Sequence, residues 1–423
     1  MGAKGNRMID KYYNGVIEQV VSGIGNVEHN SILVRYSNDF SIWDLESVNH
    51  YKDQSDIFFT CHEFSYNKIA EAYEPYLGLI RQMFHRYCSG TLEEFMEECD
   101  VYKLQRPVFE SYFEKGFCER TEQILIDEVE YEQERMCNSI VTMLQKLSEI
   151  RPVVIVLNRF QLASKSTMQL TNSLLQVKNK NIGIVLGVND VQSIPEFAHE
   201  EWDAICESMD DRNMVYHIGN AGRNMEPDVM DYYSDYESDD GYRKLNNLVY
   251  FLDFDQANHH LSKIERRIKF DNFTISEKKH YQLLLLQIMV SVLQRDIAKA
   301  LESCEDLEKL QDQEKEGAFY YNFWMATSYM YLGKLEEAMI YVQKAKECGE
   351  ALGDDFLVFR AELLKAQNQM SGWCNIFFCA QDIEISDKLI EKLNAYHYKN
   401  HRAQPLISLS DTMVHFFNRI LAL

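Results

Sequence analysis

Short, continuous apolar runs alternate along the first half of the chain with longer segments whose apolar residues recur at helical spacing. The run from Pro152 to Leu157 is almost entirely β-branched, which is typical of a strand covered by helices on both faces. Together the apolar runs predict five strands, at residues 31–36, 56–61, 152–157, 182–187 and 214–218. Helical periodicity predicts helices at residues 8–22, about 66–148 and 166–177. This alternation predicts an α/β domain with a mainly parallel sheet over residues 1–225.

The pattern changes after residue 225. Residues 226–243 are acidic with interleaved tyrosines, and we interpret them as a linker or a loop between domains. Residues 244–423 contain no convincing strand, and their pattern indicates successive helices separated by short breaks. The second half is therefore predicted to be an all-α domain.

Three of the later helical segments resemble one another, each with an alanine just before a larger residue. The alanines are Ala257, Ala300 and Ala338, which lie 43 and then 38 residues apart. That spacing is near the repeat length of two-helix solenoids, in which a small residue lets neighbouring helices approach closely. Residues 321–345 resemble a tetratricopeptide repeat (TPR) most, so residues 244–423 are predicted to form a TPR-like helical solenoid.

Composition restricts the function further. The 423 residues include 46% apolar and 26% charged side chains, and the formal net charge is -23. Such acidity argues against nucleic acid and against an anionic membrane surface as partners, because both are bound through basic faces. No apolar run approaches the roughly 18 residues of a membrane span, and the ten cysteines are scattered. These features predict a protein of the reducing cytoplasm.

The order of elements from residue 8 to about 220 resembles the STAND class of signal-transduction P-loop ATPases, ATPase modules that are joined to TPR repeats in large bacterial regulators. The best-matching segment is residues 152–167, where Gln161 and Ala163 follow an apolar strand as in that class. Two acidic residues come directly after this strand in the class, and here those positions hold Asn158 and Arg159. The resemblance implies a P-loop-NTPase-like parallel sheet followed by TPR repeats.

The departures from the class pattern decide the expected activity. A phosphate-binding loop needs glycines, a lysine and a Ser or Thr hydroxyl. The first strand is instead followed by Ser37, Asn38 and Asp39, and no glycine or lysine occurs up to residue 43. Asn158 has no charge with which to hold Mg²⁺, and Arg159 would repel the metal. We therefore predict no ATP hydrolysis, no catalytic residue and no cofactor.

Other chemistry finds little support in the sequence. Cys61, His62 and Glu63 are adjacent, which splays their side chains if they lie at a strand end. His397 and His401 share a helix face, but Tyr398 stands where a zinc-protease motif needs a glutamate. There is no Gly-x-Ser-x-Gly nucleophile elbow. No metal site and no nucleophile are predicted.

Aromatic residues are dense between residues 319 and 331. They are expected to pack between repeat helices, or in part to line a groove that binds a protein or peptide. The candidate partner-binding residues are Tyr321, Trp324, Tyr329 and Tyr331. An exposed last repeat would also lead us to expect self-association.

These observations favour a non-enzymatic bacterial regulator or scaffold, with a pseudo-ATPase domain and repeats that bind a protein partner. One alternative is a STAND switch that binds nucleotide through a non-standard loop. Another is the sensory part of a longer signalling protein whose output domain, such as a diguanylate cyclase or a transcriptional regulator, lies beyond residue 423. The sequence leaves both alternatives open.

Overall fold

The computed structural model describes residues 2–26, 30–36, 41–52, 56–65, 68–102, 105–118, 129–177, 179–189, 194–210, 215–218, 238–270 and 274–373. The chain divides into two compact units. The first is formed mainly by residues up to Gln256, and the second mainly by residues from Ala257 onward. The first unit therefore extends past residue 244, where the sequence predicts the repeats to begin. Within the described ranges, no helix is both long enough and apolar enough to cross a membrane.

The first unit is built on a five-stranded sheet whose paired strands are all parallel. The strands are β1 (Ser31–Tyr36), β2 (Phe58–Glu63), β3 (Val153–Asn158), β4 (Ile182–Asn189) and β5 (Val215–Ile218), and their order across the sheet is β2-β3-β4-β1-β5. The central strands β3 and β4 are buried along their whole length. This burial explains why their sequences are continuous apolar runs rather than alternating ones.

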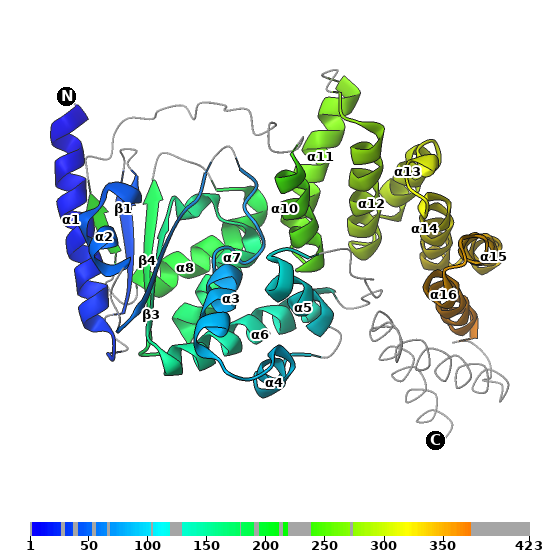
Figure 1. The fold of residues 1–423 in the computed structure, drawn as a ribbon. Helices are drawn as coiled ribbons and strands as arrows, with labels where there is room; N and C mark the ends of the chain where they lie inside the picture. The colour runs from blue at the N-terminus through cyan, green and yellow to red at the C-terminus, as the bar shows by residue number, and fades with distance from the viewer. Residues whose placement is uncertain are drawn as a thin grey trace. The chain divides into compact units, whose positions relative to one another are not determined.

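Helices flank the sheet on both sides (Figure 1). The helix α1 (Gly2–Gly23) runs along one face, against β1, β3 and β4, and the short α2 (Glu46–Lys52) contacts both α1 and β2. The other helices of this unit are α3 (Tyr76–Tyr87), α4 (Leu92–Glu98), α5 (Arg106–Lys115), α6 (Val129–Ile150), α7 (Lys165–Gln176), α8 (His199–Asp210) and α10 (Asp239–Tyr250). Short 3₁₀ turns occur at residues 42–44, 160–162 and 196–198.

All five predicted strands are present, although β2 begins two residues later than the sequence indicates. The prediction of one helical stretch over residues 66–148 is wrong, because four separate helices, α3 to α6, occupy it. Breakers account for the difference. Pro75 directly precedes α3, Gly90 lies between α3 and α4, and Gly116 follows α5 with a φ of 81°. Of residues 226–243, only 238–243 lie among the described residues, and they begin α10.

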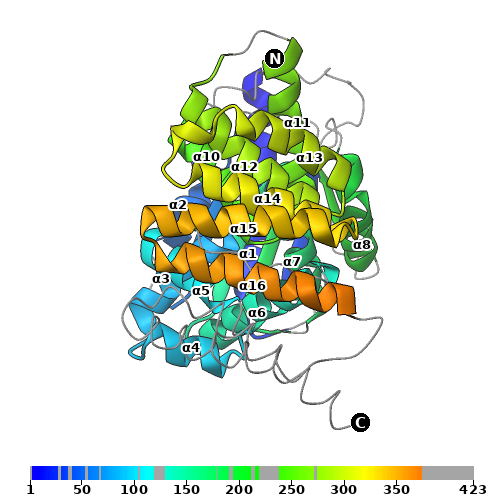
Figure 2. The same ribbon diagram turned by 90° about the vertical axis from the view of Figure 1, so that its right-hand side faces the viewer.

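The second unit is helical. Its helices are α11 (Phe254–Phe270, whose first turn belongs to the first unit), α12 (Glu277–Leu293), α13 (Ile297–Glu308), α14 (Gly317–Tyr331), α15 (Leu335–Leu352) and α16 (Asp355–Trp373). Figure 2 shows α14, α15 and α16 lying side by side, and each contacts the next.

The same turn recurs before α11, α13 and α15. In each turn, one residue adopts the left-handed conformation, with φ between 64° and 71°: Leu252, Arg295 and Gly333. The next residue donates its N–H to the carbonyl five positions earlier, at 2.8 to 2.9 Å. The three donor and acceptor pairs are Asp253 to Leu248, Asp296 to Ser291 and Lys334 to Tyr329. These are the hydrogen bonds that satisfy orphan carbonyls at a helix end.

Each of these turns leads into a helix with an alanine at its fourth residue. The alanines are Ala257, Ala300 and Ala338, and all three are fully buried. The spacing found in the sequence therefore corresponds to a repeated turn and helix start. A larger side chain at these positions would have no space, since protein interiors are close-packed.

Close packing of α1 on the sheet depends on two glycines of β4. A Cβ at Gly183 would lie 2.7 Å from Val20 Cγ1. A Cβ at Gly187 would lie 2.6 Å from Asn158 Oδ1 and would conflict with the hydroxyl of Tyr13 as well. Both glycines thus let α1 approach the strand closely.

We expect Gly187→Ala to lower the free energy of unfolding by about 1–3 kcal/mol, because the added methyl forces buried neighbours to shift. Gly15→Ala on α1 is the matched control, since nothing lies within 4 Å of a Cβ there. It should leave stability equal or raise it by up to about 1 kcal/mol. Urea unfolding measures both variants, and equal stability of the two would contradict this account of α1 packing.

Candidate functional site

A buried polar cluster lies at the carboxyl ends of the central strands, where open parallel sheets bind their ligands. Tyr36 is the last residue of β1 and Asn158 the last of β3. The Tyr36 hydroxyl donates a hydrogen bond to Asn158 Oδ1 at 2.7 Å, and neither residue is exposed to solvent. The amide oxygen of Asn158 is therefore bonded inside the protein instead of facing an open crevice.

Tyr13 of α1 completes this cluster from the helix side. It is fully buried, and burial raises the pKa of its hydroxyl well above the ordinary value, with a further contribution from Tyr36. The group therefore stays neutral near pH 7. The Tyr13 hydroxyl and the Asn158 amide oxygen both lie in the space that a Cβ at Gly187 would need. The cluster holds phenols and an amide, which are poor ligands for a magnesium ion compared with carboxylates.

Gln161 extends the polar cluster to the next strand. It is fully buried, and its Oε1 accepts the backbone N–H of Asn189, the last residue of β4, at 3.2 Å. The side chain of Gln161, which follows β3, therefore provides the acceptor for the last backbone N–H of β4. Buried polar groups need such partners, because an unsatisfied one costs about 1–3 kcal/mol.

An ion pair forms the rim of the cluster. Arg159, with a left-handed φ of 54°, places its guanidinium 3.2 Å from Glu63 Oε1 at the end of β2. The other oxygen of Glu63 accepts hydrogen bonds from Ser41 Oγ at 3.0 Å and from the backbone N–H of Ile42 at 3.2 Å. The carboxylate of Glu63, which is opposite Asn158 in the pairing of β2 with β3, is thus neutralised by Arg159.

The structure brings together two of the residues that the sequence singled out. Asn158 and Arg159 stand at the end of β3, as the strand pattern predicts, whereas Ser37, Asn38 and Asp39 lie outside the described residues. Sequence reasoning missed Tyr13 and Gly187, and it considered Glu63 only as a possible metal ligand. The glycines at 183 and 187 were the available signal, because a glycine within an apolar strand often marks close approach of another element.

A second cluster of carboxyl groups surrounds the segment that leads into α3. Glu71 Oε2 accepts a hydrogen bond from Asn247 Nδ2 at 2.9 Å, and Glu74 Oε2 accepts the backbone N–H of Glu71 at 3.1 Å. Burial, with Glu74 adding to it, raises the pKa of Glu71 to about 7. Burial also raises the pKa of Glu74.

His62 lies on the same side of the sheet as this segment. Its Nε2 is 3.4 Å from Glu74 Oε1. Burial lowers the pKa of His62 to about 4 while it raises that of Glu74, so burial disfavours charge on both groups. His62 is therefore neutral near pH 7, and we interpret the contact as a hydrogen bond rather than a full ion pair.

Asp253, just before α11, links the first turn of α7 to this region. One carboxyl oxygen accepts the backbone N–H of Ser166 at 2.8 Å, and the other accepts that of Gln256 at 3.3 Å. Each hydrogen bond satisfies a donor at a helix start. Lys165 donates to Asp255 at 2.6 Å beside it. These groups are structural caps for α7 and α11.

A metal centre finds no support in the described part of the chain, which holds no group of three or more His, Cys, Asp or Glu side chains placed for a metal ion. Cys61 and Glu63 point to one face of β2 and His62 to the other, as the alternation of a strand requires. Burial raises the pKa of Cys61 to about 12, which disfavours a reactive thiolate. His397 and His401 lie outside the described residues.

In the second unit, tyrosines gather where α14 and α15 meet. The ring centroids of Tyr321 and Tyr329 lie 6.3 and 5.5 Å from that of Tyr341. Lys334 and Lys344 lie 5.7 and 4.9 Å from the rings of Tyr329 and Tyr341. We call these five residues the tyrosine surface.

Exposed apolar side chains adjoin the tyrosine surface in the sequence, since Leu332 is 46% exposed and Ile340 57%. Trp324 is only 3% exposed, so it belongs to the interior of the helical unit and not to this surface. Tyr331 is half-buried, with the guanidinium of Arg295 4.0 Å from its ring centroid. Of the four aromatic candidates, Tyr321 and Tyr329 thus contribute to the tyrosine surface.

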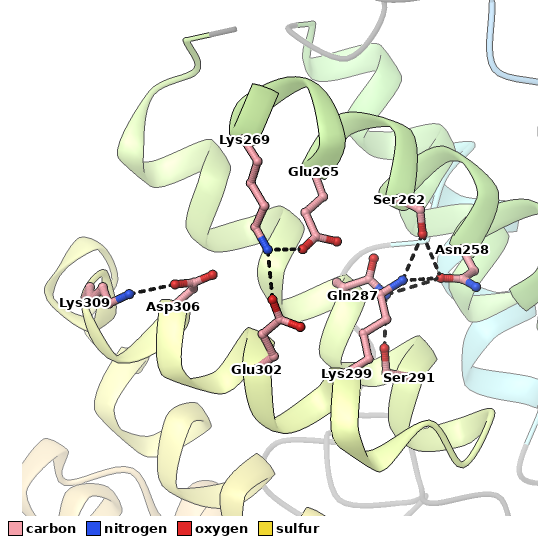
Figure 3. Close-up of polar contacts among 10 residues, drawn as sticks. All are labelled: Asn258, Ser262, Glu265, Lys269, Gln287, Ser291, Lys299, Glu302, Asp306 and Lys309. Atoms are coloured by element: carbon pink, nitrogen blue, oxygen red, sulfur yellow. Dashed lines mark hydrogen bonds and ion pairs between the residues drawn. The ribbon is translucent and has the colours of Figure 1, made fainter. Parts of the chain in front are cut away.

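Polar contacts tie α11 to its neighbours α12 and α13 (Figure 3). Lys299 Nζ donates to Asn258 Oδ1 and to Ser262 Oγ, each at 2.9 Å, and burial lowers the pKa of this lysine. Lys269 bridges Glu265 and Glu302 at 2.7 and 3.0 Å. Charge and hydrogen bonds here join helix to helix, so the network serves packing.

Comparison of the chain with protein-family models, with curated proteins and with solved structures gave no match. The geometry of the residues themselves therefore carries the functional proposal.

We expect the buried carboxyl of Glu71 to make stability depend on pH. Its pKa is about 7 in the folded protein against an ordinary 4.5, so its contribution is complete below about pH 4.5 and is lost as the pH rises through 7. Glu71→Gln keeps an oxygen for Asn247 and should raise the free energy of unfolding by about 1–2 kcal/mol at pH 8, and by less at pH 5. Urea unfolding at the two pH values measures this difference.

The control is Glu97→Gln, which removes the same charge from an exposed position of α4. It should change stability little at either pH. An equal effect of Glu71→Gln at both pH values would show that the carboxyl does not titrate as its burial requires.

Proposed function

We propose that the protein is a non-enzymatic regulator or scaffold, in which a STAND-like pseudo-ATPase domain is joined to TPR-like repeats that bind a protein partner. One observation carries the first half of this proposal. Asn158 stands where the class has a metal-binding acid, and its side-chain oxygen is fully buried and bonded to Tyr36. A magnesium ion would have to break that hydrogen bond and would meet the guanidinium of Arg159 at the rim.

The order of the strands supports the relationship to P-loop ATPases. In that class the first strand lies between the fourth and the fifth, and the third and second follow beyond the fourth, which is the order of this sheet. Nucleotide in such a sheet binds outside the carboxyl end of the first strand. Here that strand ends in Tyr36, whose hydroxyl is directed to Asn158.

The recurring turn supports the proposal of TPR-like repeats. Three helix starts share a left-handed residue, the same backbone hydrogen bond and a fully buried alanine. Solenoids of this kind usually bind partners through exposed faces of consecutive helices. The tyrosine surface on α14 and α15 is the best-placed region for such binding, because Tyr and cationic side chains are common in interfaces.

Titration calorimetry with ATP and Mg²⁺, and with ADP in parallel, tests the pseudo-ATPase proposal. We expect no saturable heat at millimolar nucleotide, since a site without the phosphate cradle and the metal ligand loses most of its affinity. A cooperative thermal unfolding transition of the same sample shows that the protein is folded.

Saturable nucleotide binding in this experiment would contradict the proposal. It would favour the alternative of a nucleotide-controlled switch, with the phosphates held near residues 37–43. ATP turnover that is lost in an Asn158→Ala variant would exclude a non-enzymatic role altogether.

A further inference from the structure

A groove of about 560 Å³ runs along the outer edge of β2 in the first unit. Trp43, Val48 and Lys52 line it from the side of α2, whereas Arg86, Tyr87 and Arg151 line it from the opposite side. The floor consists of β2 itself, from Phe58 to Cys61. The groove is not purely apolar, because three cationic and several aromatic side chains are among the residues that line it.

The floor of the groove is an edge of the five-stranded sheet. β2 is an edge strand, and among the described residues no strand pairs with its outer side. Phe58 and Phe64 donate their N–H groups toward β3, at 2.7 and 3.0 Å. Because successive residues of a strand point their backbone groups to opposite sides, Phe59 and Cys61 direct theirs into the groove. Such an edge is a template for an added strand.

Three cations surround this edge. Lys52 and Arg86 are exposed, and Arg151 is half-buried, with its guanidinium donating to the Tyr87 hydroxyl at 2.7 Å. Within the described residues none of the three forms an ion pair with a carboxylate, in a chain whose net charge is -23. Cations that gather on an acidic protein without a carboxylate partner among the described residues favour an anionic ligand.

Aromatic rings accompany these cations. Lys52 lies 6.0 Å from the ring centroid of Trp43, which is 49% exposed, and Arg151 lies 5.1 Å from that of Tyr87. Exposed tryptophan and paired Arg and Tyr are the residue types that contribute most in protein interfaces. The groove therefore offers contact area as well as charge.

We propose that this groove binds an extended acidic peptide segment of a partner protein, which adds a strand to the free edge of β2. The side chains of an added strand alternate between the two sides of the sheet. Acidic side chains on one side would meet Lys52, and those on the other would meet Arg86 and Arg151. None of the residues that line the groove belongs to the polar cluster at the carboxyl ends of the strands or to the tyrosine surface.

Fluorescence anisotropy of the full chain with a labelled heptapeptide of alternating glutamate and valine tests the proposal. We expect saturable binding that weakens as salt is raised, because exposed charges are screened. A Lys52→Gln and Arg86→Gln double variant should bind about tenfold more weakly. The matched control is the Lys11→Gln and Lys180→Gln double variant, which removes two exposed charges elsewhere in the same unit and should bind as the wild type does.

Two further peptides separate strand addition from simple charge attraction. The same peptide with lysine in place of glutamate should not bind. A peptide with alternate backbone amides methylated keeps its charges but cannot form the strand hydrogen bonds, so it should bind much more weakly.

Several results would overturn the proposal. The first is that the glutamate peptide does not bind, and the second is that the control variant weakens binding as much as the groove variant does. The third is that the methylated peptide binds fully, which would indicate a site for anions in general. Aggregation of the groove variant with unchanged peptide binding would show that the cations only protect the edge from self-pairing. Dimerisation of the wild type through β2, measured by sedimentation, would make a second copy of the chain the occupant.

Discussion

The hydrogen bond between Tyr36 and Asn158 lies where three elements of the first unit meet. It joins the carboxyl ends of β1 and β3 across β4, and this is sterically feasible because Gly187 of β4 has no side chain. The same gap admits Tyr13, so α1 can pack directly on the sheet. With Arg159 and Glu63 paired at the rim, the polar side chains at these strand ends are bonded to other groups of the protein. This closure of the strand ends underlies our proposal of a pseudo-ATPase.

If the sheet carries no catalytic site, its role in the protein is structural. A rigid parallel sheet supports surfaces at its margins, and the cationic groove at the β2 edge is one of them. The repeated turns of α11, α13 and α15 give the helical part a regular scaffold of its own, with the tyrosine surface exposed on it. We propose that both surfaces recruit protein partners, which would make the chain an adaptor.

The sequence predicted the strands well, because buried parallel strands are short continuous apolar runs rich in β-branched residues. It also placed the alanines 257, 300 and 338, since a small residue at fixed spacing follows from helix packing. The prediction of a single helical stretch over residues 66–148 was wrong, because it gave the many helix-forming residues more weight than the helix breakers Pro75, Gly90 and Gly116. The hydrogen bond of Tyr36 to Asn158 could not be foreseen, because it joins residues 122 positions apart and depends on the order of the strands.

The most direct measurement of the central claim is the stability of an Asn158→Asp variant with and without millimolar Mg²⁺. If the strand ends form a closed structural cluster, a carboxylate there is buried, and the nearby guanidinium of Arg159 is already paired with Glu63. The free energy of unfolding should then fall by about 1–3 kcal/mol at neutral pH, and Mg²⁺ should not restore it. If Mg²⁺ instead stabilised the variant above the wild type, the strand ends would still form an open metal site, and the account of a closed cluster would be wrong.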